Sequence, residues 1–272
     1  MCGRYILVSK LKKIEKRFNL KPSAIELPFE ANYNISPGSF APVITSQEPN
    51  DLQLFRFGLT PFWAKKPMYL INARAEGNYN KDNDIRYNGR LGIKEKPSFR
   101  KPFTSQRCLI PADAFIEGTT VEKLSKPFVV YPVRKEDRPF AFAGLYDYWL
   151  DKSSGEIIAS FCIITTTPPP ILQLLPHHRS PVCLEDSQEE AVWLDKNAST
   201  SDLEDLLRRR SGNRFNAYPI DPVIKNPRLN HADLIKPLGE RIIKEFDYEI
   251  ERDIELFGMG MTTSRKRRNQ QE

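Results

Sequence analysis

The chain has 272 residues, of which 40% are hydrophobic and 28% are charged, a balance that suits one large domain or two small ones and excludes both a small disulfide scaffold and global disorder. Its formal net charge is +6. The longest uncharged run, 157–178, is interrupted by three consecutive prolines, so it is not a membrane helix. The opening residues lack the pattern of a secretory signal, which predicts a cytoplasmic protein.

Short strands dominate the predicted secondary structure, because runs of β-branched and aromatic residues alternate with turns rich in Pro, Gly, Asn and Asp. The first strand is expected at 3–8, followed by a short helix that Ser9 caps. Further strands are expected at 41–45, 52–58, 107–116, 126–133, 139–150 and 157–167, and helices at 187–195, 201–210 and 239–256. This order of predicted strands and helices indicates an α+β fold, with a curved, mainly antiparallel β-sheet or open barrel and flanking helices.

The chain contains no linker or internal repeat, so we expect one domain at 1–257 and a disordered basic tail at 258–272. A second basic stretch, 81–107, has eight basic side chains against three acidic ones, which favours an anionic partner. The four cysteines, Cys2, Cys108, Cys162 and Cys183, lack the spacing of a metal site or a disulfide framework, so neither is predicted. The last three are interpreted as small core residues.

The second residue carries the strongest chemical signal. Removal of Met1 would leave Cys2 with a thiol and a free α-amine on the same carbon. An α-amine has a pKa of about 8, against about 10.4 for lysine, so more of it is neutral and nucleophilic near pH 7. Such an amine forms a Schiff base with an aldehyde, and the thiol can then close a five-membered thiazolidine. The alternative is that Cys2 is only a small residue beside the initiator methionine.

Eight sequence blocks occur in a fixed order along the chain. They are MCGRY (1–5), YNISPG (33–38), FGLTPFWAKKP (57–67), INARAE (71–76), PSFRKPFTSQRCLIPADAFIE (97–117), AFAGLY (141–146), FCIITTTP (161–168) and LPHHRSPV (175–182). In content and order they resemble the SOS-response-associated peptidase (SRAP) family of abasic-site processing proteins. The resemblance extends over most of 1–182 and is loose over 183–257.

The resemblance implies a protein that binds single-stranded DNA and crosslinks through the processed Cys2 to the ring-opened aldehyde of an abasic site, shielding the lesion in the DNA damage response. It also implies Schiff-base lyase and self-cleaving peptidase chemistry, no cofactor, no metal, no membrane, a monomer, and a nucleoid or, in a eukaryote, nuclear location. It places Cys2, Asn72, Glu117 and His177 in the catalytic site, and Arg4, Asn34, Pro37, Trp63 and Arg74 on the DNA. A carboxyl and an imidazole suit the proton transfers that open the sugar and dehydrate a carbinolamine.

Two positions depart from the family pattern. Gly118 stands where tryptophan often follows the catalytic glutamate, and Ala64 stands where a second tryptophan is common. Stacking on an aromatic side chain contributes about 1–3 kcal/mol per base, so these departures predict weaker DNA binding or the use of other aromatics.

Two other classes of function are compatible with parts of the sequence. Glutamine amidotransferases with an N-terminal nucleophile also begin Met-Cys-Gly, and a noncatalytic single-strand DNA-binding module would use only the basic patch. Incubation with abasic single-stranded DNA, followed by a denaturing gel, separates the three.

Overall fold

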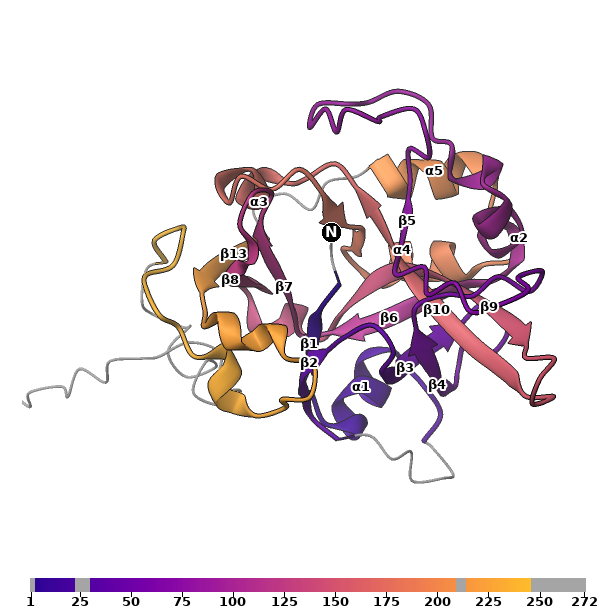
Figure 1. Cartoon of the computed structure of the whole chain (residues 1–272), viewed down its shortest axis with the longest axis horizontal. Helices are drawn as coiled ribbons and strands as arrows, with labels where there is room; N and C mark the ends of the chain where they lie inside the picture. Colours follow the sequence, from indigo (N-terminus) through magenta and orange to yellow (C-terminus); the bar gives the residue numbers. More distant parts are fainter. Residues whose placement is uncertain (1–2, 23–29, 209–213, 246–272) are drawn as a thin grey trace, which may run out of the picture.

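The computed structural model describes residues 3–22, 30–208 and 214–245, in which thirteen strands form two sheets (Figure 1). Five strands of the larger sheet close into a barrel, because β10 pairs with β9 on one side and with β4 on the other. The barrel strands are β3 (Phe40–Thr45), β4 (Leu52–Phe57), β6 (Arg107–Ala112), β9 (Phe140–Leu150) and β10 (Ile157–Thr166). Only the β10–β4 contact in this ring is parallel, so the prediction of a mainly antiparallel fold is confirmed.

The barrel is filled by aromatic side chains. Phe57 and Phe161 stack with ring centroids 5.1 Å apart, and Phe142 makes edge contacts with Tyr5 and Phe140. Three short strands extend the barrel sheet: β5 (Asn72–Arg74) and β11 (Ser180–Pro181) pair with β10, and β12 (Cys183–Leu184) pairs with β9. These additions bring β5 and the chain around β11 to one end of β10.

The second sheet has the order β13-β8-β7-β1-β2, with β1 (Tyr5–Leu7) near its edge. The other members are β2 (Asn32–Ile35), β7 (Ala114–Thr119), β8 (Lys123–Pro132) and β13 (Phe215–Pro219). The predicted single strand at 107–116 is wrong, because the chain leaves the barrel at Asp113 and enters this sheet as β7. The Asp113 carboxylate accepts hydrogen bonds from the backbone N–H groups of Val8 and Ser9, at 2.7 Å each.

Short helices cover the sheets. They are α1 (Leu11–Arg17), α2 (Pro97–Ser105), α3 (Pro170–Leu174), α4 (Ser187–Leu194) and α5 (Thr200–Arg208), with 3-10 turns at Ile93–Glu95, Lys135–Asp137, Pro222–Lys225 and Ala232–Ile235. The helices predicted near 187–195 and 201–210 are confirmed as α4 and α5. Within the described residues, no helix is long and apolar enough to span a bilayer.

Several details of the predicted helices are wrong. The Ser9 hydroxyl donates to Asp113 at 2.6 Å instead of capping α1. The capping-box spacing of Ser187 and Glu190 predicts that Ser187 caps the helix at 187–195, but Asp186 caps α4 by accepting from two backbone N–H groups. The expected helix at 239–256 is absent from 239–245, and 246–256 lies outside the described residues, as does the tail at 258–272.

Candidate active site

A cavity of about 560 Å³ opens between the two sheets, lined by residues of the N-terminal segment, β5, the β7–β8 hairpin and the loop after α3. Of the nine site residues predicted from the sequence, five line it: Arg4, Pro37, Arg74, Glu117 and His177. These residues are far apart in the chain, and the pairing of β1 with β7 and of β5 with β10 brings them together. Gly3, the immediate chain neighbour of Cys2, also lines the cavity, whereas Cys2 itself lies outside the described residues.

Glu117 and His177 form a buried pair in this cavity. The Nε2 atom of His177 lies 3.3 Å from the Oε2 atom of Glu117, and both residues are at most 5% exposed. Glu117 is fixed on β7 opposite Phe128 of β8, while the His177 backbone N–H donates to the carbonyl of Leu172 in α3 at 2.9 Å. The pair is therefore held by two separate elements.

Burial lowers the pKa of His177 to about 3, and the neighbouring His178 and Arg179 act in the same direction. The His177 and His178 rings stack with centroids 5.4 Å apart. At neutral pH the His177 imidazole is therefore neutral, with one nitrogen able to donate a proton and the other able to accept one. Together with the adjacent carboxyl it can move protons on and off a substrate oxygen.

Arg179, which also lines the cavity, belongs to a buried ion pair. The two terminal guanidinium nitrogens of Arg179, Nη1 and Nη2, donate to the Glu76 carboxylate at 2.8 and 2.9 Å, and both residues are 1% exposed. Arg179 also donates to the backbone carbonyl of Thr165 in β10 at 2.7 Å. Such a bidentate pair, tied to β10 by a further hydrogen bond, fixes its partners in one geometry. The sequence contained Glu76 as the last residue of the INARAE block, but nothing in the pattern paired it with Arg179.

Asn72 and Arg74 belong to β5, in register with Ile163 and Thr165 of β10. Alternation along the strand puts both on the same face, although only Arg74 lines the cavity. The Arg74 guanidinium donates to the backbone carbonyl of Asn80. Burial, and then the charge of Arg179, lower the pKa of Arg74.

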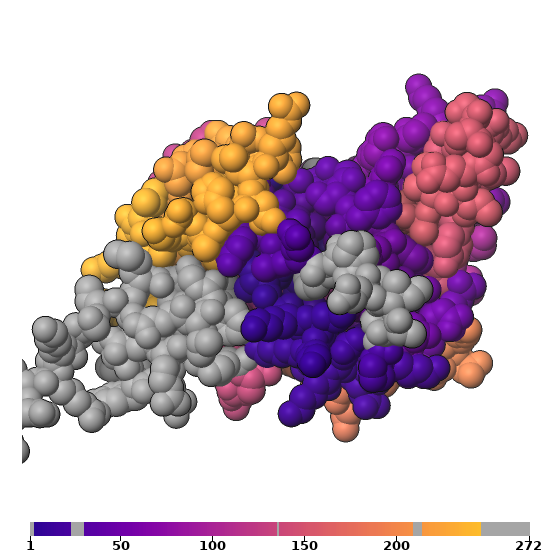
Figure 2. Space-filling model, turned by 90° about the horizontal axis from the view of Figure 1, so that it is seen from below, coloured from indigo at the N-terminus to yellow at the C-terminus, as the bar shows by residue number. Residues whose placement is uncertain are grey.

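Arg4 and Asn34 are joined to the C-terminal part of the described chain. Arg4 donates to the Asn34 side-chain oxygen and to the carbonyl of Lys225, at 2.6 Å each. Asn34 is 2% exposed, and its Nδ2 donates to the carbonyls of Ile224 and Asn226. Figure 2 shows residues 214–245 as a lobe beside the N-terminal region. Asn34 thus fixes Arg4 against this lobe.

Trp63 lies outside the cavity. It is 46% exposed and, with Phe62, lines a separate hollow of about 580 Å³ against α2. Ala64 is buried, and its carbonyl accepts a hydrogen bond from the indole of Trp149 at 2.6 Å. A Cβ atom on Gly118 would lie 1.8 Å from the Lys123 carbonyl oxygen, so the β7–β8 hairpin has no room for a side chain there.

The model for the family described as SOS response associated peptidase (SRAP) matches residues 1–227. The chain belongs to the SRAP family. The "Abasic site processing protein YoqW" of Bacillus subtilis is 34% identical over 244 residues, covering 87% of this chain and 99% of the relative. The "Abasic site processing protein HMCES" of Xenopus tropicalis is 26% identical over 228 residues, covering 74% of this chain and 64% of the relative.

The SRAP fold is also found in solved structures. A protein from Bacteroides thetaiotaomicron superposes with a TM-score of 0.65 at 28% identity, covering 84% of this chain and 100% of that one. A Bordetella bronchiseptica protein gives 0.60 at 22% identity, covering 81% and 100%, a likeness of fold alone. In the described ranges of this SRAP chain, no group of three or more His, Cys, Asp or Glu side chains forms a candidate metal site.

Proposed function

We propose that this protein processes abasic sites in DNA by forming a covalent bond between Cys2 and the lesion. The observation that carries the proposal is the buried Glu117–His177 pair, 3.3 Å apart, in a cavity lined by the residue next to Cys2. The names of the relatives, abasic site processing proteins from Bacillus subtilis and Xenopus tropicalis, support the same substrate. No cofactor is needed for this chemistry.

The reaction begins when the α-amine of processed Cys2 attacks the C1 aldehyde of the opened abasic sugar. The carbinolamine formed loses water to give a Schiff base, and the thiol then adds across the C=N bond, so that sulfur bonds to carbon and the proton passes to nitrogen. Opening of the closed sugar requires proton transfer between its O1 hydroxyl and O4, which we assign to the neutral imidazole of His177. Loss of water requires a proton on the departing oxygen, which we assign to Glu117.

We propose that the DNA partner is single-stranded and that Arg4 and Arg74 contact phosphates at the cavity. Asn34 is buried and hydrogen-bonded to Arg4, which gives it the role of positioning that guanidinium. Pro37 forms part of the wall and exposed Trp63 offers a stacking surface. Asn72 shares the face of β5 that carries Arg74 and is assigned to the catalytic site.

The finer activities belong to the same proposal. A Schiff base at C1 acidifies the C2 proton, so its removal would cleave the strand by β-elimination and give lyase activity. Hydrolysis of the Met1–Cys2 peptide bond would account for the peptidase name of the family. We propose a monomer that acts where the chromosome lies, in the nucleoid of a bacterium or the nucleus of a eukaryote.

The test is incubation of processed protein with a single strand that contains one abasic site, followed by a denaturing gel and mass spectrometry of the adduct. We expect a heat-stable adduct with the mass of a thiazolidine. Cys2→Ser retains the α-amine and should give only an adduct that borohydride must trap, because a hydroxyl closes the ring poorly. A normal thiazolidine yield from Cys2→Ala would refute the proposal, and an undamaged strand is the control.

A further inference from the structure

A sixteen-residue loop from Gly77 to Gly92 leaves the barrel at β5 and returns to the same point. Its ends are in backbone contact: a Cβ atom on Gly77 would lie 2.7 Å from the carbonyl of Gly92, and φ of Gly77 is +58°. The N–H groups of Gly92 and Ile93 both donate to the carbonyl of Ala75 at 3.1 Å. Surface loops whose ends are closed in this way are frequently functional.

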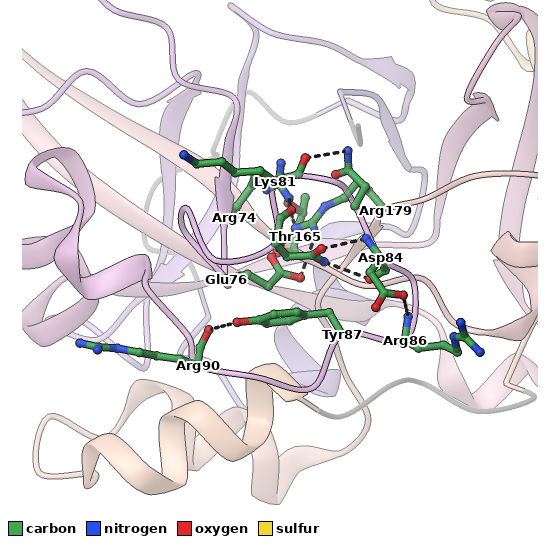
Figure 3. A network of polar contacts seen from close by, with 11 residues as sticks. Arg74, Glu76, Lys81, Asp84, Arg86, Tyr87, Arg90, Thr165 and Arg179 are labelled. Carbon is green, nitrogen blue, oxygen red and sulfur yellow. Dashed lines mark hydrogen bonds and ion pairs between the residues drawn. The ribbon is translucent and has the colours of Figure 1, made fainter.

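The base of the loop is anchored on the cavity wall. Arg74 donates to the backbone carbonyl of Asn80, whose side chain is 3% exposed. The Asn80 side chain accepts from the N–H of Asp84 at 2.8 Å and donates to its carbonyl at 3.0 Å, which closes a tight turn (Figure 3). Asn83, inside this turn, has φ of +56° and lines the cavity. The loop is thus a fixed part of the rim.

Most basic side chains of the 81–107 stretch already have structural partners. Arg90 pairs with Glu95 at 2.7 Å, and Lys94 pairs with Glu204 at 2.9 Å. Arg107 is 1% exposed and donates to backbone carbonyls, so its charge is not at the surface. The excess of positive charge read from the sequence is therefore reduced at the surface.

Lys81 and Arg86 differ from these residues. Both are exposed, and neither forms an ion pair with any residue in the part of the chain that the structure describes. In Figure 3 their side chains extend away from the hydrogen-bonded turn, one on each side of it. The nearby Asp84 accepts the backbone N–H of Arg86 at 2.9 Å. The rim of the cavity therefore presents two cations on a rigid support.

We propose that the 77–92 loop is a second DNA-binding element, in which Lys81 and Arg86 bind backbone phosphates of the strand next to the abasic site. The proposal rests on the proposed function for the identity of the strand. Its chemical basis is separate. Neither cation is ion-paired to a described residue, although Asp82 and Asp84 lie on the same turn, so both remain available to phosphate. The anchoring by Asn80 removes part of the entropy cost of ordering them.

The test measures binding of an undamaged single strand to wild type and to Lys81→Ala/Arg86→Ala by fluorescence anisotropy over a range of salt concentrations. Two lost phosphate contacts should make the plot of log K against log salt shallower by about 1.4, at about 0.7 per contact. If the two proteins bind equally at 1 M salt, this difference in slope makes the variant bind about 25-fold more weakly than wild type at 0.1 M salt.

The matched control is Lys12→Ala/Lys152→Ala, which removes the same charge from exposed positions on α1 and the β9–β10 turn. In Figure 1 these elements lie on the opposite side of the view from the loop. The control should retain the wild-type slope. Equal slopes for the two double variants would overturn the proposal. Because the strand is undamaged, this result does not depend on crosslinking: absence of any wild-type adduct with abasic DNA would instead refute the proposed function.

Discussion

The protonation state of His177 can be tested through the pH dependence of folding. The pKa of His177 is lowered to about 3 in the folded protein, mainly by burial, whereas an unfolded histidine titrates near 6.5. Between these values the unfolded chain binds a proton that the folded chain does not, so folding stability falls as pH is lowered through 6.5. At pH 5, 1.5 pH units below the unfolded pKa, this loss is about 2 kcal/mol. A loss of this size requires only that the pKa of His177 in the folded protein lies well below 5.

The assay is urea unfolding of wild type and His177→Gln at pH 7.5 and pH 5. Wild type should lose about 2 kcal/mol more than the variant between the two pH values. Any cost of the substitution itself cancels, because each protein is compared with itself. The chain has only three histidines, so NMR titration of their ring protons gives an independent reading. Equal losses would show that His177 is protonated beside Glu117 and would refute the neutral imidazole.

Three further predictions concern the same cavity. In single-turnover assays, His177→Ala should slow crosslinking to natural abasic DNA but have less effect with a pre-opened aldehyde. Glu117→Gln should slow crosslinking to both substrates by about 10²–10⁴-fold. Equal defects of His177→Ala on the two substrates would remove its ring-opening role. Glu76→Gln leaves the Arg179 charge buried without its partner and should cost about 3–5 kcal/mol in urea unfolding. Its control, Glu136→Gln at an exposed pair, should cost less than about 1 kcal/mol, and equal costs would contradict the argument. Gly118→Ala should destabilise the protein by about 1–3 kcal/mol in the same assay, because its Cβ meets the Lys123 backbone; an unchanged stability would show that the hairpin opens freely.

The barrel strands can be predicted from the sequence because the residue patterns that indicate them lie within each strand. The segments at 139–150 and 157–167 contain long β-branched and aromatic runs, and they form β9 and β10. The break at Asp113 was not predictable, because its carboxylate is satisfied by Val8 and Ser9, more than 100 residues away in the chain. Helix α2 was missed for a different reason: Pro97 at its first turn is well tolerated, but Pro102 inside it argues against a helix.

The candidate site was predictable residue by residue but not as an arrangement. The sequence blocks pointed to Glu117 and His177, and the structure brings them to 3.3 Å. The pairing of Glu76 with Arg179, and the use of Asn80 to hold a loop against Arg74, depend on strand register and on a turn that sequence patterns do not specify. The family pattern makes Gly118 a lost stacking residue, whereas the hairpin geometry shows that it is a steric requirement of this chain.

Burial and nearby positive charge both lower the pKa values of the two histidines that line the cavity. Arg179 is paired with Glu76, and Arg4 and Arg74 donate to an amide oxygen and to backbone carbonyls, which hold each guanidinium in a fixed orientation. Fixed positive charge attracts phosphate and disfavours any further proton. Burial, the main cause of the lowered pKa of His177, and nearby positive charge would both lower the pKa of an α-amine brought into the cavity. Under the proposed function, the α-amine of processed Cys2 would then have a larger neutral fraction and attack the aldehyde faster.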